Sequence, residues 1–167
     1  RASERLLGSI GSVIPASPER LRLEAVVDGR ACAGQVAVAR AAGTIERLWL
    51  EPRDAAASPR AVEAIAGADQ IVLGPGSLYT SLMAVLLVPG IAEAINQSEA
   101  RLIYVANLRT QDAETLGMDA AHHLDVLLSM TGVRMPSAIV ANTKAVVVET
   151  PLEPIVVDPD VLATYGV

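Results

Sequence analysis

The chain has 167 residues, of which 51% are hydrophobic and 19% are charged, and its mean hydropathy is +0.40. This length and apolar content suit one packed domain, and they exclude a largely disordered protein. The formal net charge of −6 argues against general nucleic-acid binding, which needs a basic surface. The lone cysteine, Cys32, excludes an intrachain disulfide and fits a reducing compartment.

Residues 1–57 predict a connecting segment followed by a small antiparallel sheet. Apolar and polar residues alternate over residues 21–27, and Asp28-Gly29 is a hairpin turn signal. An extended pattern resumes at residues 32–39, and residues 45–50 add a third strand.

Residues 58–167 alternate between helical and extended patterns, beginning at the helix-start signal Ser58-Pro59. We expect helices at residues 61–68, 77–87, 91–97 and 119–131. We expect strands at residues 71–73, 102–106, 138–141, 146–148 and 155–157. This alternation predicts an α/β fold whose parallel strands are joined by right-handed crossovers.

Residues 70–92 carry no charge, which raises the question of a membrane span. Gly74-Pro75-Gly76 and Pro89-Gly90 divide the stretch into pieces that are each too short to cross a bilayer. We therefore expect a protein interior and no membrane span. The chain begins with Arg1 and shows no signal peptide, so we expect it to be part of a longer protein.

The motif Gly74-Pro75-Gly76-Ser77 lies between an expected strand and an expected helix. Its glycines would let the backbone approach a ligand closely, with a positive φ at Gly76, and Ser77 is a good N-cap. Free N–H groups at such a turn can bind an anion, but a plain tight turn has the same sequence. Tyr79 and Thr80 follow in the first helical turn, where Tyr79 could stack on a ligand, face solvent or border the core.

A second polar group follows the expected strand 102–106 and contains Asn107, Arg109, Thr110, Gln111, Glu114 and Thr115. Ligands of open parallel sheets bind beyond the carboxyl ends of the strands, so two such polar tips predict one shared crevice. Arg109 could pair with a phosphate or form an ordinary salt bridge. His123 follows the N-cap Asp119 and is a candidate ligand-binding or catalytic residue. We expect no dedicated transition-metal site, because no cluster of His, Cys, Asp and Glu has ligand spacing.

Three segments and His123 resemble the gluconeogenesis factor family of the 2-phospho-L-lactate transferase-like (CofD-like) superfamily, in order and spacing. The segments are GPGSLYTS at 74–81, LLVPGIAEAI at 86–95 and TQDAET at 110–115. The resemblance implies a Rossmann-like fold with a three-layer parallel sheet, in a protein of the bacterial cytoplasm. It also implies binding of UDP-sugars such as UDP-N-acetylglucosamine, and an influence on cell shape and peptidoglycan synthesis.

We expect the nucleotide sugar to be bound by residues of both polar tips and by one helix: Gly74, Pro75, Gly76, Ser77, Tyr79, Thr80, Asn107, Arg109, Thr110, Gln111, Glu114, Thr115 and His123. We also expect a homo-oligomer, protein partners that regulate the cell wall, and no nucleic-acid partner.

The chain departs from the family pattern in three places. Ala84-Val85 stands where the family usually has Pro-Asn, and Asp112-Ala113 stands where it usually has Pro-Gly, so we expect a different backbone shape in that loop. The family's N-terminal glycine-rich loop and its Asp-Asp-Gly-Gly segment are missing. We therefore expect the carboxyl-terminal part of the protein, holding only part of the pocket.

Three functions remain open. The first is a nucleotide-sugar-binding regulator without turnover. The second is a transferase of the 2-phospho-L-lactate type, which acts on a nucleotide-activated phospho compound with Mg²⁺ and would use His123 as a base. The third is a purely structural or oligomerisation domain. No obvious nucleophile accompanies His123 in the sequence, which favours the regulator.

Overall fold

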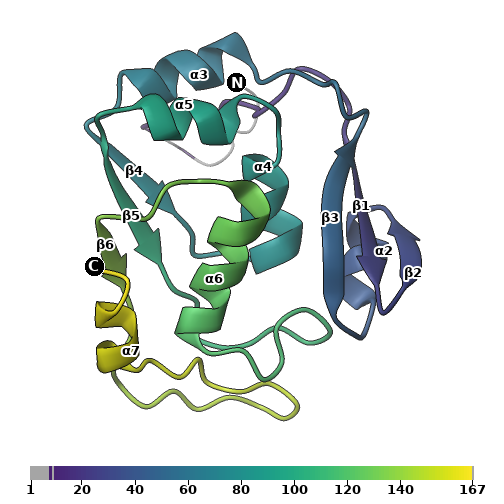
Figure 1. Ribbon diagram of the computed structural model, residues 1–167, viewed down its shortest axis with the longest axis vertical. Helices are drawn as coiled ribbons and strands as arrows, with labels where there is room; N and C mark the ends of the chain where they lie inside the picture. Colours follow the sequence, from purple (N-terminus) through teal and green to yellow (C-terminus); the bar gives the residue numbers. More distant parts are fainter. Residues whose placement is uncertain (1–7, 9, 167) are drawn as a thin grey trace.

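The computed structural model describes residue 8 and residues 10–166. Part of the connecting segment expected at residues 1–17 therefore lies outside the described residues. A small antiparallel sheet stands at one end of the molecule, and a parallel sheet with its helices forms the rest (Figure 1).

The small sheet contains β1 (Arg22–Val27), β2 (Arg30–Ala33) and β3 (Ile45–Glu51), in the order β2-β1-β3. Val27 pairs with Arg30 across the predicted Asp28-Gly29 turn, and β3 pairs antiparallel with β1. The strands expected at residues 21–27 and 45–50 are therefore confirmed, whereas the strand expected at residues 32–39 is present only in part, as β2 ends at Ala33. Val27 and Leu23 of β1 are buried and belong to the main hydrophobic core.

The second sheet, the parallel sheet, contains β4 (Gln70–Leu73), β5 (Arg101–Val105) and β6 (Ala138–Val140), which are adjacent in chain order. Its helices are α3 (Pro59–Ala66), η1 (Leu78–Met83), α4 (Ala84–Leu86), α5 (Ile91–Gln97), α6 (Ala120–Thr131) and α7 (Pro159–Ala163). The predicted α/β alternation is confirmed. In α6, the Asp119 carboxylate accepts a hydrogen bond from His122 N, and Gly132 ends the helix in the left-handed conformation.

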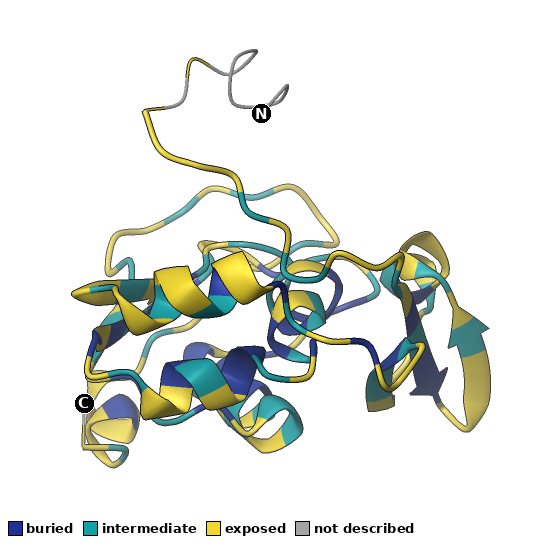
Figure 2. Ribbon diagram, turned by 90° about the horizontal axis from the view of Figure 1, so that it is seen from above, coloured by how far each residue is buried: buried dark blue, intermediate teal, exposed yellow. Residues whose placement is uncertain are grey.

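One face of the parallel sheet is covered by helices. Leu73, Leu102 and Tyr104 on that face are at most 5% exposed, whereas Val72 and Val140 on the opposite face are each 54% exposed. The described residues thus supply two of the three expected layers, the sheet and the helices on one side. Figure 2 shows α3 and α5 with exposed residues on their outer surfaces and buried residues turned inward.

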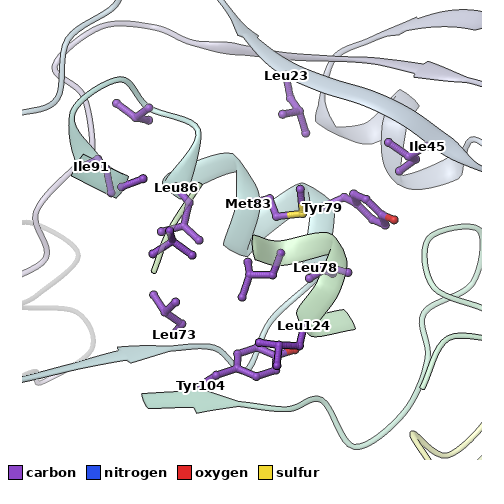
Figure 3. Close-up of a cluster of buried hydrophobic side chains, with 14 of the residues drawn as sticks. Leu23, Ile45, Leu73, Leu78, Tyr79, Met83, Leu86, Ile91, Tyr104 and Leu124 are labelled. Carbon is purple, nitrogen blue, oxygen red and sulfur yellow. The ribbon is translucent and has the colours of Figure 1, made fainter. Parts of the chain in front are cut away.

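The core joins the two sheets through the helix η1. Tyr79 and Met83 of this helix lie between Leu23 and Ile45 of the small sheet and the side chains of Tyr104 and Leu124 (Figure 3). Because apolar side chains pack against η1 from both sides, these contacts fix the position of the helix. The polar turn that precedes it is therefore held on a rigid element.

Four predictions about the elements need correction or addition. Residues 35–40 form the helix α2 (Gln35–Arg40) and not a strand, because Gly34 (φ +92°) ends β2 and the helix buries Val38 completely. The segment predicted as one helix at residues 77–87 contains two types of helix: η1 is a π-helix, and α4 follows it directly as an α-helix. π-Helical turns are rare and often occur at functional sites.

The late strands expected at residues 146–148 and 155–157 are also wrong. Val147 is fully exposed, and residues 153–156 instead form backbone hydrogen bonds with the loop that follows β5. The helix α7 was missed, although Asp158-Pro159 carries an N-cap and N1 signal, and the Asp158 carboxylate caps Asp160 N and Val161 N.

We expect Gly74→Ala to destabilise the fold. Gly74 has a φ of +87°, and a Cβ there would lie 2.7 Å from the Val105 carbonyl oxygen, so the end of β5 would have to move. A strained backbone of this kind costs roughly 1–3 kcal/mol, which chemical denaturation would measure as a lower free energy of unfolding.

Gly76→Ala is the matched control. Its φ lies outside the positive region, contrary to our expectation, and a Cβ there would meet Ser81 Cβ at an ordinary 3.8 Å. Equal losses of stability in the two variants would contradict the argument from backbone geometry.

Candidate functional site

The two polar strand tips lie side by side, joined by the side-chain amide of Asn107. The Gly76 N–H donates to Asn107 Oδ1 at 3.1 Å, and Asn107 Nδ2 donates to the Gly76 carbonyl at 2.9 Å. The predicted shared edge is therefore present. The polar atoms of Asn107 are used within the protein to hold the two loops together.

Two further hydrogen bonds form parallel rungs between η1 and the second loop. Gln111 Nε2 donates to Ser77 Oγ at 2.8 Å, and Thr80 Oγ1 donates to Glu114 Oε1 at 2.6 Å. Ser77 and Thr80 are three residues apart, as are Gln111 and Glu114, so each pair lies on one face of its own turn. This shared spacing was visible in the sequence, but the pairing was not.

The second loop is braced from behind by buried threonines. Thr115 Oγ1 accepts a hydrogen bond from Gln111 N, and Thr110 Oγ1 accepts one from Glu153 N, both at 2.8 Å. Each threonine is 1% exposed. Thr110 and Thr115 therefore organise the loop through the hydroxyls that we expected to face a ligand.

The loop also contains a residue in a conformation that favours glycine. Ala113 has a φ of +63°, in the left-handed region that few residues other than glycine adopt. The family pattern has glycine at this place, so the backbone conformation is one that glycine would adopt without strain.

Three polar atoms of the site are buried without a hydrogen-bond partner in the described part of the chain: Gln111 Oε1, Glu114 Oε2 and His123 Nε2. Glu114 is 8% exposed and His123 is 1% exposed. The ion pairs found among the described residues are Arg22–Glu24 and Arg53–Glu51, so no cation neutralises Glu114 there. Unmet hydrogen-bonding capacity at a buried polar group is costly, and it marks a place where a ligand can bind.

His123 is held in one tautomer. Its Nδ1 lies 2.8 Å from the Asp119 carbonyl oxygen, which can only accept, so Nδ1 carries the proton and Nε2 is an acceptor in the neutral ring. Burial lowers the pKa of His123, an effect that the hydrogen bond to the Asp119 backbone opposes. A neutral imidazole with a free acceptor atom follows from these two facts.

The remaining predicted site residues lie in different surroundings. The Tyr79 ring is in the hydrophobic core, and burial, followed by the nearby Glu114 carboxylate, raises the pKa of its hydroxyl (Figure 3). Arg109 is exposed and its backbone bridges to Pro154. Pro75 is exposed and borders, with Gly74 and Gly76, an apolar groove of about 490 Å³ beside β4 and α5.

Sequence analysis missed one residue of the site. Gln35, which begins α2, donates from Nε2 to the Thr80 carbonyl at 2.8 Å and so ties the small sheet to the rung that holds Glu114. Nothing in the sequence signalled this contact, because the residue was assigned to a strand. Beside it, a cavity of about 480 Å³ is lined by Gln35, Thr80 and residues of both regions.

Residue 8 and residues 10–166 contain no group of three or more His, Cys, Asp and Glu residues placed to hold a metal ion. In the same residues no single helix has the length and apolar character to cross a membrane, although the pair Leu78–Leu86 and Ile91–Gln97, bent by 69°, has them when taken together.

The chain is similar to known proteins along its whole length. A family model described as 2-phospho-L-lactate transferase CofD matches residues 1–164. The gluconeogenesis factor of Halalkalibacterium halodurans is 39% identical over 98% of this chain and 53% of its own length. A relative from Mycobacterium tuberculosis is 43% identical over 74% of this chain and 38% of its own length.

A solved structure shares the fold. The crystal structure of a UPF0052 family protein from Bacillus halodurans has a TM-score of 0.91 and 36% identity, covering 99% of this chain and 56% of that one. The chain therefore spans about half the length of this protein and of the Halalkalibacterium relative.

The neutral state of buried His123 predicts a pH dependence of stability. Its folded pKa lies below the ordinary value of 6.5, so the unfolded chain takes up a proton below about pH 6.5 that the folded chain resists. The free energy of unfolding should fall on acidification through that range, by at most about 1.4 kcal/mol per pH unit from this group.

His123→Asn should flatten this slope, because Asn keeps a donor for the Asp119 carbonyl but does not titrate. His122→Asn, at the exposed neighbouring position, is the control. Denaturation curves at several pH values would measure both, and an unchanged slope in the His123 variant would contradict a buried neutral ring.

The left-handed conformation of Ala113 predicts that Ala113→Gly stabilises the chain. The left-handed conformation costs an L-residue roughly 1–2 kcal/mol. Glycine avoids this cost but loses more backbone entropy on folding, so we expect the free energy of unfolding to rise by about 0.5–1 kcal/mol. Ala121→Gly in α6 is the control and should lose about 1 kcal/mol. A loss of stability in both variants would show that Ala113 is not strained.

Proposed function

Because the chain belongs to the CofD family, which includes the gluconeogenesis factors, we propose that it binds a nucleotide sugar as a regulatory protein. The observation that carries this proposal is the pair of rungs at the carboxyl edge of the parallel sheet, with buried acceptor atoms left unpartnered. The carboxyl edge of a parallel sheet is the usual place for a nucleotide ligand in an α/β fold.

The chemistry of the crevice supports binding without turnover. Covalent catalysis with His123 as a base would need a protein nucleophile within hydrogen-bond reach of Nε2. No such partner of Nε2 is present among the described residues, and Nδ1 is occupied by a backbone carbonyl. In the proposed role, His123 contacts the ligand as a hydrogen-bond acceptor.

The ligand that we propose is a UDP-sugar of the UDP-N-acetylglucosamine kind. Arg109 is exposed near the start of the second loop, and an exposed guanidinium can pair with a phosphate through two hydrogen bonds. The resemblance of the GPGSLYTS and TQDAET segments to the gluconeogenesis factors supports this choice. We further propose a cytoplasmic homo-oligomer that acts on cell shape and cell-wall synthesis through protein partners.

The alternative is a transferase of the 2-phospho-L-lactate type, using Mg²⁺ and a nucleotide-activated phospho compound. The observation in its favour is the family model that matches residues 1–164, whose description names that enzyme. In this case His123→Asn would cut turnover by about 10²–10⁴ while binding survives.

Calorimetry and thermal unfolding of the full-length protein with UDP-N-acetylglucosamine test the proposal. A bound ligand at a hundred times its Kd should add about 2.7 kcal/mol of stability. Gln111→Ala should weaken binding by about 1–3 kcal/mol, because it leaves a ligand group and Ser77 without a partner. Gln97→Ala, at an exposed position of α5, is the matched control.

Two results would contradict the regulatory role. The first is the absence of binding to the unmodified full-length protein. The second is transfer or hydrolysis of the nucleotide sugar that disappears in His123→Asn, which would favour the transferase.

A further inference from the structure

The unpartnered atoms of Gln111, Glu114 and His123 are hydrogen-bond acceptors, and this restricts the ligand groups that they can bind. The Glu114 carboxyl accepts a hydrogen bond from Thr80 at Oε1 and has its Oε2 unpartnered among the described residues. Gln111 spends a donor on Ser77 and has its Oε1 unpartnered. His123, neutral and protonated on Nδ1, adds a third acceptor at Nε2.

Such a surface repels phosphate. A phosphate oxygen is itself an acceptor and carries negative charge, so placing it against a buried carboxylate would bring like charges together in a medium of low dielectric. Hydroxyl and amide N–H groups instead donate to a carboxylate, in charge-assisted bonds that are stronger than neutral ones.

We propose that Gln111 and Glu114 form an acceptor subsite that binds the hydrogen-bond-donating, phosphate-free part of the ligand. This inference rests on the proposed function, within which the donors are the hydroxyl and amide groups of the sugar or the imide N–H of the base. The phosphates lie elsewhere, toward the exposed Arg109.

Hydrogen bonds within the protein hold the side chains of Gln111 and Glu114 in place without a ligand. Glu114 is fixed by Thr80, whose carbonyl in turn accepts a hydrogen bond from Gln35 of α2. Gln111 is fixed at both its side chain, by Ser77, and its backbone N–H, by Thr115. Both free acceptors are covered by protein, so binding at the proposed subsite requires a local displacement of the protein around them.

Glu114→Gln is the variant that tests the inference. The amide oxygen can keep the hydrogen bond from Thr80, but the second position becomes an NH₂ group that points a donor at the ligand's donor. We expect the affinity for UDP-N-acetylglucosamine to fall about tenfold, as for the loss of one hydrogen bond of about 1.4 kcal/mol. Glu63→Gln, at an exposed position of α3, changes the net charge equally and should leave the affinity unchanged.

Three ligands, measured by calorimetry on the full-length protein, identify the donor. If UDP-N-acetylglucosamine is weakened and UDP is not, the subsite holds the sugar. If both are weakened and inorganic pyrophosphate is not, it holds the base. If pyrophosphate is weakened as much as the nucleotides, or if no ligand is weakened, the inference is overturned.

Thermal unfolding of the ligand-free protein gives a test that does not depend on nucleotide-sugar binding. A buried carboxylate with an unpartnered oxygen lowers the free energy of unfolding of the ligand-free protein, and a neutral amide at the same position lowers it less. Glu114→Gln should therefore leave Tm unchanged or raise it. A Tm lowered by several degrees relative to Glu63→Gln would show that the carboxylate has a structural partner, and would overturn the subsite. Failure of the unmodified protein to bind any nucleotide sugar would instead refute the proposed function alone.

Discussion

The pairing of the Asn107 amide with both backbone polar groups of Gly76 is the constraint on which the site depends. It joins the end of β5 to the turn after β4 and so sets the register between two loops that are thirty-one residues apart. With this register fixed, Ser77 meets Gln111 and Thr80 meets Glu114. One neighbouring pair of parallel strands thereby supplies both halves of the crevice.

The π-helix η1 transmits this arrangement to the rest of the fold. Its apolar side chains, including Tyr79 and Met83, fill the space between the two sheets, and the hydroxyls of Thr80 and of the N-cap residue Ser77 are hydrogen-bonded to the second loop. The helix α2, which follows β2, also contributes to the site: Gln35 donates to the carbonyl of Thr80, whose hydroxyl donates to Glu114.

Sequence patterns predicted the parallel sheet and the common edge, because buried apolar runs ending in Gly, Ser and Asn mark strand ends irrespective of tertiary detail. They failed where a single backbone angle or a long-range contact decides the outcome. Gly34 turns an alternating segment into the helix α2, and residues 153–156 pair with the loop after β5 instead of with the sheet. The roles of Asn107, Thr110 and Thr115 as internal braces could not be predicted, since a hydroxyl or amide that faces a ligand and one that faces a backbone group have the same sequence.

The unpartnered acceptors give the site its capacity to discriminate between ligands. A site that must hydrogen-bond its ligand rejects an analogue without the matching donor far more strongly than an apolar site rejects a missing methylene, because its buried polar groups are then left unpaired. In this chain Glu114 cannot find a cation among the described residues, and its Oε2 and Gln111 Oε1 lack donors there. A hydrogen-bond donor at these atoms, from a ligand or from water, would remove the cost of leaving them unpaired. For the proposed nucleotide ligand, this predicts selection by its uncharged, donor-bearing part, with the phosphates contributing affinity common to all nucleotides.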